Sequence, residues 1–201
     1  MSPATPASAA VRNAEPGVAA LAALRGLCAP LTAGDFEPAC VVVQPDEIPQ
    51  PADALLVHHE HMTEVLHKRY GRPVELAVLD ERLDGDRYTR KVKLAPGGAD
   101  RPVVEWGAVR LDFRFMSSAV RDEILAKRTP LGAILIKHDV HRRIKPRWFM
   151  RFPARGPTLA WFGDAGNDPL YGRIGTIYCD EEPAIELLEI VTAAPVGGGR
   201  A

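Results

Sequence analysis

Two glutamates, Glu186 and Glu189, interrupt residues 185–191, one of the most hydrophobic stretches of the chain. If this stretch is a strand, residues three apart point to opposite faces. When one face is core, the carboxylate on that face is enclosed, and it needs a partner or a raised pKa. The spacing therefore predicts one enclosed carboxyl group, which is a candidate for acid–base chemistry.

Arg90 lies in residues 88–94, where charged residues alternate with apolar ones. On a strand this alternation puts the charged side chains on one face. Arg90 could face solvent, or it could point into a cavity and bind a carboxylate through its two-pronged guanidinium group. The alternation by itself favours solvent, and both alternatives stay open on this pattern.

Three histidines, His58, His59 and His61, fall in a segment that we expect to be helical. His58 and His61 would share one helix face, so a metal site would need a further ligand from His138 or His141. The chain has no HExxH motif, and adjacent histidines near a helix start are usually surface or capping residues. The sequence therefore predicts no metal site.

A basic stretch begins at residue 142 and carries six cations and no anion up to residue 155. It could attract an anionic substrate or a nucleic-acid backbone. Alternate residues of a strand face water, so a solvated basic face over an apolar one is the favoured interpretation. The cations are Arg142, Arg143, Lys145, Arg147, Arg151 and Arg155, and Trp148, Phe149 and Phe152 lie among them.

The sequence offers no support for covalent catalysis or for a nucleotide cofactor. Ser117 and Ser118 lie in no GxSxG motif, and none of the cysteines has a histidine neighbour. Cys28, Cys40 and Cys179 are odd in number and far apart, so they predict neither a disulfide framework nor a metal knuckle. Neither GxGxxG nor GxxxxGK[ST] occurs. We expect no cofactor.

Composition limits the class of protein further. The chain has 201 residues and a mass of 21.9 kDa, enough for one ordinary domain. Its 25 basic and 26 acidic residues give 25 − 26 = −1, which argues against nucleic acid as the main partner. No apolar run approaches the roughly 18 residues of a membrane span, and we identify no signal peptide. We expect a soluble, cytoplasmic protein.

The elements that must position these residues follow from local patterns. We expect residues 1–16 to form a flexible N-terminal arm, residues 17–194 to form the domain, and residues 195–201 to be a disordered tail. A short helix follows Gly17 and ends near Cys28. The apolar run at residues 40–43 predicts either a short strand or a buried loop.

The middle and the end of the chain predict a sheet with a few helices. Apolar residues at helical spacing predict one amphipathic helix that Asp53 caps and Gly71 ends. The order of elements indicates an α+β domain, with a single antiparallel sheet covered by helices on one face. The expected strands are residues 74–79, 88–94, 103–113, 142–152, 172–179 and 184–192, the first three forming a meander, and a short helix spans residues 118–127.

The chain resembles the chorismate pyruvate-lyase (4-hydroxybenzoate synthase) family. The resemblance covers residues 50–193 and rests on the order and spacing of several short motifs. These are Leu55-Leu-Val-His-His-Glu-His-Met-Thr, Tyr88-Thr-Arg-Lys-Val, Val104-Glu-Trp-Gly-Ala-Val-Arg, Thr129-Pro-Leu-Gly and the glutamate-rich last strand. It implies a chorismate lyase-like α+β fold, whose active site is closed off from water by helical flaps.

The resemblance also implies roles for individual residues. Met62 and Leu131 would contact the ligand through their backbones, and Arg90 would bind the ring carboxylate. A glutamate of the last strand would meet the oxygen at the opposite end of the ring. We expect this to be Glu189, with Glu186 as the second choice, because a slip of one residue in the strand register would exchange their faces.

The implied reaction eliminates pyruvate from chorismate and leaves 4-hydroxybenzoate, without metal or cofactor. Chorismate would be the small-molecule partner, with no nucleic acid and no membrane, and the chain would be a monomer or a weak homodimer. Two alternatives stay open: a ligand-binding sensor domain of the same fold, and a chorismate-converting enzyme that gives another hydroxybenzoate.

Overall fold

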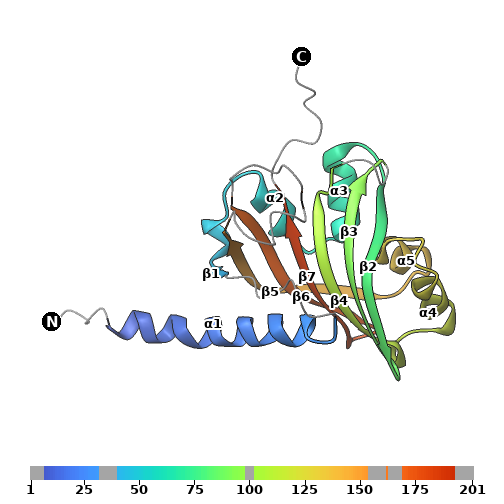
Figure 1. Ribbon diagram of the computed structural model, residues 1–201, viewed down its shortest axis with the longest axis horizontal. Helices are drawn as coiled ribbons and strands as arrows, with labels where there is room; N and C mark the ends of the chain where they lie inside the picture. The colour runs from blue at the N-terminus through green and yellow to red at the C-terminus, as the bar shows by residue number, and fades with distance from the viewer. Residues whose placement is uncertain (1–6, 32–39, 98–101, 154–161, 163–168, 193–201) are drawn as a thin grey trace, which may run out of the picture.

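One seven-stranded sheet forms the centre of the molecule (Figure 1). The computed structural model describes residues 7–31, 40–97, 102–153, 162 and 169–192. Every neighbouring pair of strands in the sheet is antiparallel, which confirms the predicted α+β class. The strands lie in the order β1 (Val41–Val43), β5 (Arg142–Phe152), β6 (Leu170–Cys179), β7 (Glu182–Val191), β4 (Glu105–Asp112), β3 (Arg87–Pro96) and β2 (Val74–Asp84).

The tight turns between strands follow from local sequence. Gly85 has φ 58° between β2 and β3, a left-handed conformation that glycine adopts without a steric penalty. Asp180 and Glu181 have φ 49° and 66° in the hairpin between β6 and β7. The predicted meander of β2, β3 and β4 is confirmed, and the apolar run after Cys40 forms the edge strand β1.

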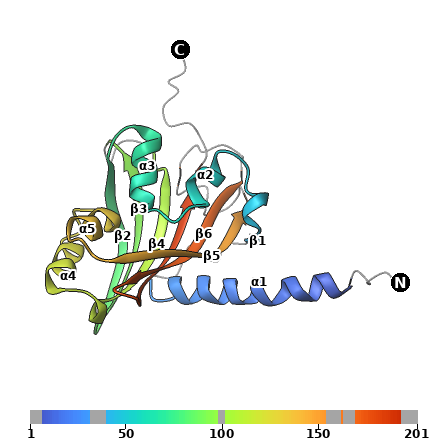
Figure 2. The same cartoon turned by 180° about the vertical axis from the view of Figure 1, so that it is seen from behind.

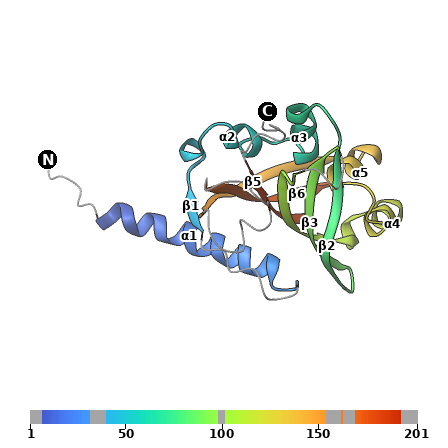
Figure 3. The same ribbon diagram turned by 45° about the horizontal axis from the view of Figure 1, so that its top comes forward.

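Helices cover both faces of the sheet, so the prediction of helices on one face is wrong (Figure 3). Four helices, α2 (Ala52–Leu56), α3 (Met62–Tyr70), α4 (Ser118–Leu125) and α5 (Leu131–Lys137), lie on one side, and α1 (Ala7–Cys28) lies on the other. The reason is visible in β4, where side chains of both faces are buried. A strand that is apolar on both sides needs cover on both sides.

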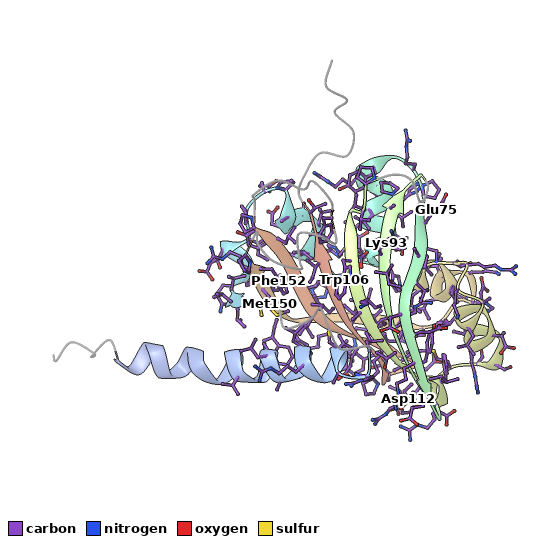
Figure 4. All side chains as sticks on the ribbon, viewed as in Figure 1. Glu75, Lys93, Trp106, Asp112, Met150 and Phe152 are labelled. Atoms are coloured by element: carbon purple, nitrogen blue, oxygen red, sulfur yellow. The ribbon has the colours of Figure 1, made fainter. Side chains whose placement is uncertain are left out.

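The face under α1 is an apolar core. Leu24 and Leu27 of α1 pack in one cluster with Trp106, Met150 and Phe152 of the sheet. Figure 4 labels these three sheet residues, and Figure 2 shows the same arrangement of α1 and the sheet from behind. This face therefore contributes to stability through burial of large apolar side chains.

Helix α1 begins at Ala7, earlier than predicted, so the expectation of a flexible arm does not describe residues 7–16. Pro16 and Gly17, which we interpreted as the helix start, lie inside the helix. Alanine has the highest helix propensity, and the alanines of α1 offset the loss of the backbone hydrogen bond that Pro16 cannot donate. Residues 1–6 and the predicted tail at residues 195–201 lie outside the described residues. Within the described part of the chain, no helix has the length and hydropathy needed to cross a membrane.

The predicted long helix before Gly71 is wrong in one respect: it is two helices, α2 and α3, separated by residues 57–61. Asp53 lies inside α2 and does not cap it, whereas the predicted end at Gly71, with φ 67°, is confirmed. The helix is interrupted because Nη1 of Arg173 in β6 donates hydrogen bonds to the backbone carbonyls of Leu56 and His58, each at 2.9 Å. In a continuous helix these carbonyls would accept from the next turn.

Candidate functional site

A cavity lies on the face of the sheet that α2–α5 cover, between strands β2, β3, β4, β6 and β7 and the first residues of α3 and α5. The volume of the cavity is about 70 Å³. One water needs roughly 10–15 Å³ of such a volume, so the cavity holds several waters or a compound of about one ring. Its walls are mainly apolar, with charged side chains from three strands.

Four of the five predicted site residues line this cavity: Met62, Arg90, Leu131 and Glu189. Met62 and Leu131 are the first residues of α3 and α5, and Arg90 and Glu189 lie in β3 and β7. The structure thus brings together four side chains that are up to 127 positions apart, since 189 − 62 = 127. The roles that the resemblance implies for them stay predictions.

Glu186, the second choice for the ring oxygen, does not line this cavity. It pairs with Arg110, whose Nη1 also donates to the carbonyl of Gly26 in α1 at 3.0 Å. Opposite Glu186 on β4 stands Arg110, whereas opposite Glu189 stands Gly107. The two glutamates therefore project from opposite faces, as their spacing predicts, and Glu189 is the one on the cavity face.

Arg90 is 1% exposed, although its alternating surroundings favoured solvent. Its Nη1 donates to the carbonyl of Ile124 over a long 3.4 Å, and its Nε has no hydrogen-bond partner within the described residues. Burial lowers the pKa of Arg90, opposed by Tyr88 and Glu81. Arginine nevertheless stays charged in proteins, so a buried cation with a spare donor lines the cavity.

Arg173 is the second buried arginine of this face, also 1% exposed, and sequence reasoning missed it. Its Nε donates to Oε2 of Glu189 at 2.6 Å, and its Nη1 donates to the two carbonyls at the helix break. The signal was present: Arg173 stands between Gly172 and Gly175 in an apolar strand. A Cβ at position 172 would lie 2.7 Å from the carbonyl oxygen of Glu189, so that position needs glycine.

Glu105 is the other charged residue that sequence reasoning missed as a site residue. It is 4% exposed, lines the cavity, and its Oε2 has no hydrogen-bond partner among the described residues. Burial, and next the charge of Glu189, raise the pKa of Glu105 well above its usual value, while Arg173 opposes them. A single acidic residue beside Trp106 in the apolar residues 103–109 was the available signal.

The first residues of α3 and α5 close the cavity, and glycine permits their contact. A Cβ at Gly132 would lie 2.2 Å from Oγ1 of Thr63 and 3.0 Å from Cβ of His61, so no larger residue fits. Oγ1 of Thr63 is buried without a partner in the described part of the chain. Two short helices thus cover the cavity with their N-terminal ends.

His61 separates the cavity from a wider outer groove, and it lines both spaces. Its Nε2 accepts a hydrogen bond from Nε of Arg142. Burial, with smaller contributions from Arg142 and Arg173, lowers the pKa of His61 to about 4. His61 is therefore neutral at neutral pH and acts as an acceptor.

The remaining histidines do not gather around one point. The ring of His138 pairs with Glu123 at 2.8 Å, and His141 lies exposed near Glu181. In the regions that the structure describes, no three His, Cys, Asp or Glu side chains form a group that could hold a metal ion. Of the basic stretch, Arg143, Lys145, Arg147 and Arg151 are exposed, Arg142 reaches His61, and Arg155 lies outside the described residues.

Comparisons with known proteins give distant likenesses in structure. No family model and no curated protein matches the chain. The structure is similar to PhnF from Mycobacterium smegmatis, with 12% identity and a TM-score of 0.48, over 68% of this chain and 65% of that one. It is also similar to the C-terminal domain of Yurk from Bacillus subtilis, with 11% identity and a TM-score of 0.35, over 61% and 90% of the two chains.

The chain thus matches less than two thirds of the length of PhnF. At these identities and TM-scores we transfer neither residues nor activity from either protein. What the structure itself defines is an α+β protein with a single antiparallel sheet and a ring-sized cavity on one face.

Proposed function

We propose that the cavity binds a small carboxylic acid of about one ring, and that the protein eliminates pyruvate from chorismate to give 4-hydroxybenzoate. The observation that carries the proposal is Arg90. Its guanidinium is buried in the wall of the cavity, and its Nε lacks a partner within the described residues. A buried donor on a cation is costly to leave unpaired, and a ligand carboxylate satisfies it with a charge-assisted hydrogen bond.

The residues at the other end of the cavity support a ligand with a second polar group. Glu189 and Glu105 both line that end. Oε2 of Glu189 is engaged by Arg173, which fixes the carboxylate and leaves its other oxygen for a ligand. A ring with a carboxylate at one end and an oxygen at the other fits this distribution of charge.

The proposed reaction needs few catalytic groups. In chorismate the ether bond between the ring and the enolpyruvyl group breaks, and the ring carbon that bears the hydroxyl group loses its proton. The ring becomes aromatic, and the departing enolpyruvate takes up a proton and becomes pyruvate. Aromatisation supplies the driving force, so the protein has to orient the substrate, exclude water and hold one proton. Arg90 would orient the substrate by binding its ring carboxylate, and Glu189 would contact the ring oxygen.

A sensor domain that binds such an acid without converting it is the second candidate. The observation in its favour is the ion pair between Arg173 and Glu189, which commits one oxygen of that carboxylate. An ion-paired glutamate is well placed to position a ligand and less free to move a proton. A chorismate-converting enzyme with another hydroxybenzoate as its product would use the same cavity.

Incubation of the purified full chain with chorismate tests the proposal. We expect pyruvate and 4-hydroxybenzoate in equal amounts, with no loss of turnover after exhaustive chelation. Arg90→Ala should lose most of the activity. Arg110→Ala, which removes an arginine of the opposite face, serves as the matched control. Binding of 4-hydroxybenzoate without release of pyruvate would favour the sensor, and a different aromatic product would favour the third alternative.

A further inference from the structure

Glu105 has no structural role that accounts for its burial. It lies in β4, opposite Leu94 of β3 and Val191 of β7, and is 4% exposed. The nearby cation Arg173 donates hydrogen bonds from its Nε to Glu189 and from its Nη1 to backbone carbonyls. Oε2 of Glu105 has no hydrogen-bond partner among the described residues, so no hydrogen bond there compensates for the removal of this oxygen from water.

The carboxyl group of Glu105 is directed toward the open space of the cavity. Gly107, two residues along β4 on the same face, also lines the cavity. A Cβ at Gly107 would lie 3.3 Å from Oε1 of Glu105, so the carboxyl group leans over the glycine. The absence of a side chain at position 107 thus gives Glu105 its access to a ligand.

Glu105 lies beyond Glu189 as seen from Arg90. Along β3, Glu105 stands opposite Leu94, which is four residues from Arg90. At ~3.3 Å per residue the two backbone positions are separated by roughly 13 Å. This separation leaves room for a single ring with a substituent at each end.

We propose that Glu105 is a further ligand-binding residue, which donates a hydrogen bond from its carboxylic acid to an uncharged hydroxyl or ether oxygen of the ligand. The inference rests on the proposed binding of a ring carboxylic acid in this cavity. Burial and the neighbouring Glu189 raise the pKa of Glu105 well above its usual value, with Arg173 as the opposing charge, which favours the carboxylic acid form that can donate. The negative charge of Glu189 disfavours a second carboxylate at this end, which is why the oxygen is uncharged.

Two probe ligands separate this hydrogen bond from the rest of the site. Benzoate has the carboxylate for Arg90 and no oxygen for Glu105 or Glu189, whereas 4-hydroxybenzoate adds a hydroxyl group that both can contact. We expect the wild type to bind 4-hydroxybenzoate more tightly than benzoate, with about five- to tenfold of the preference due to the one hydrogen bond from Glu105. Titration calorimetry measures both dissociation constants.

Variants of Glu105 then test the donor. Glu105→Gln keeps a donor and the shape, so it should retain most of the preference for 4-hydroxybenzoate. Glu105→Leu removes the donor and should reduce the preference about five- to tenfold while it leaves the affinity for benzoate unchanged within about twofold. Glu186→Leu, on the opposite face, is the matched control and should keep the full preference. Thermal unfolding of each variant identifies any that fails to fold, and if Glu105→Leu fails, Glu105→Met, which also lacks the donor, replaces it.

The outcomes distinguish the inference from the proposed function. A preference that is undiminished in Glu105→Leu overturns the role of Glu105, whatever the enzymatic activity. A preference equally lost in folded Glu105→Gln overturns its role as a donor. If the wild type shows the preference but releases no pyruvate from chorismate, only the lyase activity fails. If the wild type binds neither compound, both proposals fail.

Discussion

Two arginines on the same face of the sheet, Arg90 and Arg173, are equally buried and differ in their partners. Each is 1% exposed. Arg173 donates to one carboxylate and two carbonyls, whereas Arg90 has a long hydrogen bond to Ile124, lies beside Tyr88 and Glu81, and keeps a spare Nε within the described residues. The fold satisfies Arg173 by itself and leaves Arg90 incomplete. A buried charge that the fold leaves incomplete is a candidate for ligand binding, and one that the fold satisfies is a candidate for stability.

The largest expected effect is on stability at Arg173. Arg173→Met leaves Glu189 as an uncompensated buried charge and frees the carbonyls of Leu56 and His58. Removal of one partner of a buried pair costs roughly 3–5 kcal/mol. Urea unfolding followed by circular dichroism measures the free energy of unfolding. Arg90→Met is the matched control and should lose less than about 1 kcal/mol.

A double variant sharpens this prediction. Arg173→Met combined with Glu189→Gln removes both charges and should recover part of the lost stability. Equal losses for Arg173→Met and Arg90→Met would contradict the distinction between the two arginines, because both would then be structural.

The second expected effect is on activity at Arg90. Arg90→Ala should lower kcat/KM by about thirty- to a thousandfold, or roughly 2–4 kcal/mol, because a charge-assisted hydrogen bond in an enclosed site is lost. Arg90→Lys should recover little, since a point charge cannot reproduce a two-pronged donor. Steady-state assays of pyruvate release measure both. Near-normal kcat/KM in Arg90→Ala would place the carboxylate elsewhere.

The same two arginines show how much the sequence alone could predict. The meander of β2, β3 and β4 and the helix end at Gly71 depend on neighbouring residues, so local patterns predicted them. The break between α2 and α3 depends on Arg173, which is 115 residues from His58 in sequence, and no local pattern contains that contact. Alternation around Arg90 favoured solvent, whereas Ile124 of α4 covers it.

The two faces of β7 and β4 also show how far local sequence patterns can predict the site. The opposite orientation of Glu186 and Glu189 followed from their spacing. Which of them faces the cavity depends on the strand register. The structure puts Glu189 in the cavity wall, and the role that the resemblance implies for it stays a prediction. Glu105 was missed as a site residue because its burial depends on helices far away in sequence. Its raised pKa depends first on that burial and next on Glu189 in another strand.

His61 is the last residue of the segment between α2 and α3. The titration of the His61 side chain gives the third prediction. The pKa of His61 is about 4 in the folded chain against 6.5 ordinarily, so the unfolded chain binds more protons between these values. Stability that is present above pH 6.5 is therefore lost as the pH falls toward 4, by on the order of 2–3 kcal/mol.

Unfolding free energies measured between pH 7 and 4 test this. His61→Asn should reduce the decline of the unfolding free energy at low pH. His141→Asn should not reduce it, because the side chain of His141 is 73% exposed. Glu105 acts in the opposite direction, because a raised pKa in the folded chain makes its contribution more favourable as the pH falls. A decline of equal size in His61→Asn would show that His61 is not its source.

The smallest expected effects compare Glu189 with Glu186. Glu189→Gln should lower kcat about ten- to a hundredfold and destabilise the chain by roughly 1–2 kcal/mol, because Arg173 loses its charged partner. Glu186→Gln breaks a partly exposed pair with Arg110 and should cost less than about 1 kcal/mol, with kcat unchanged. The reverse result for kcat would move the ring oxygen to the α1 face, where Arg110 would replace Arg90 as the anchor. If both variants kept full kcat while Arg90→Ala abolished binding, the cavity would bind its ligand without a catalytic carboxylate, and the sensor would be the better description.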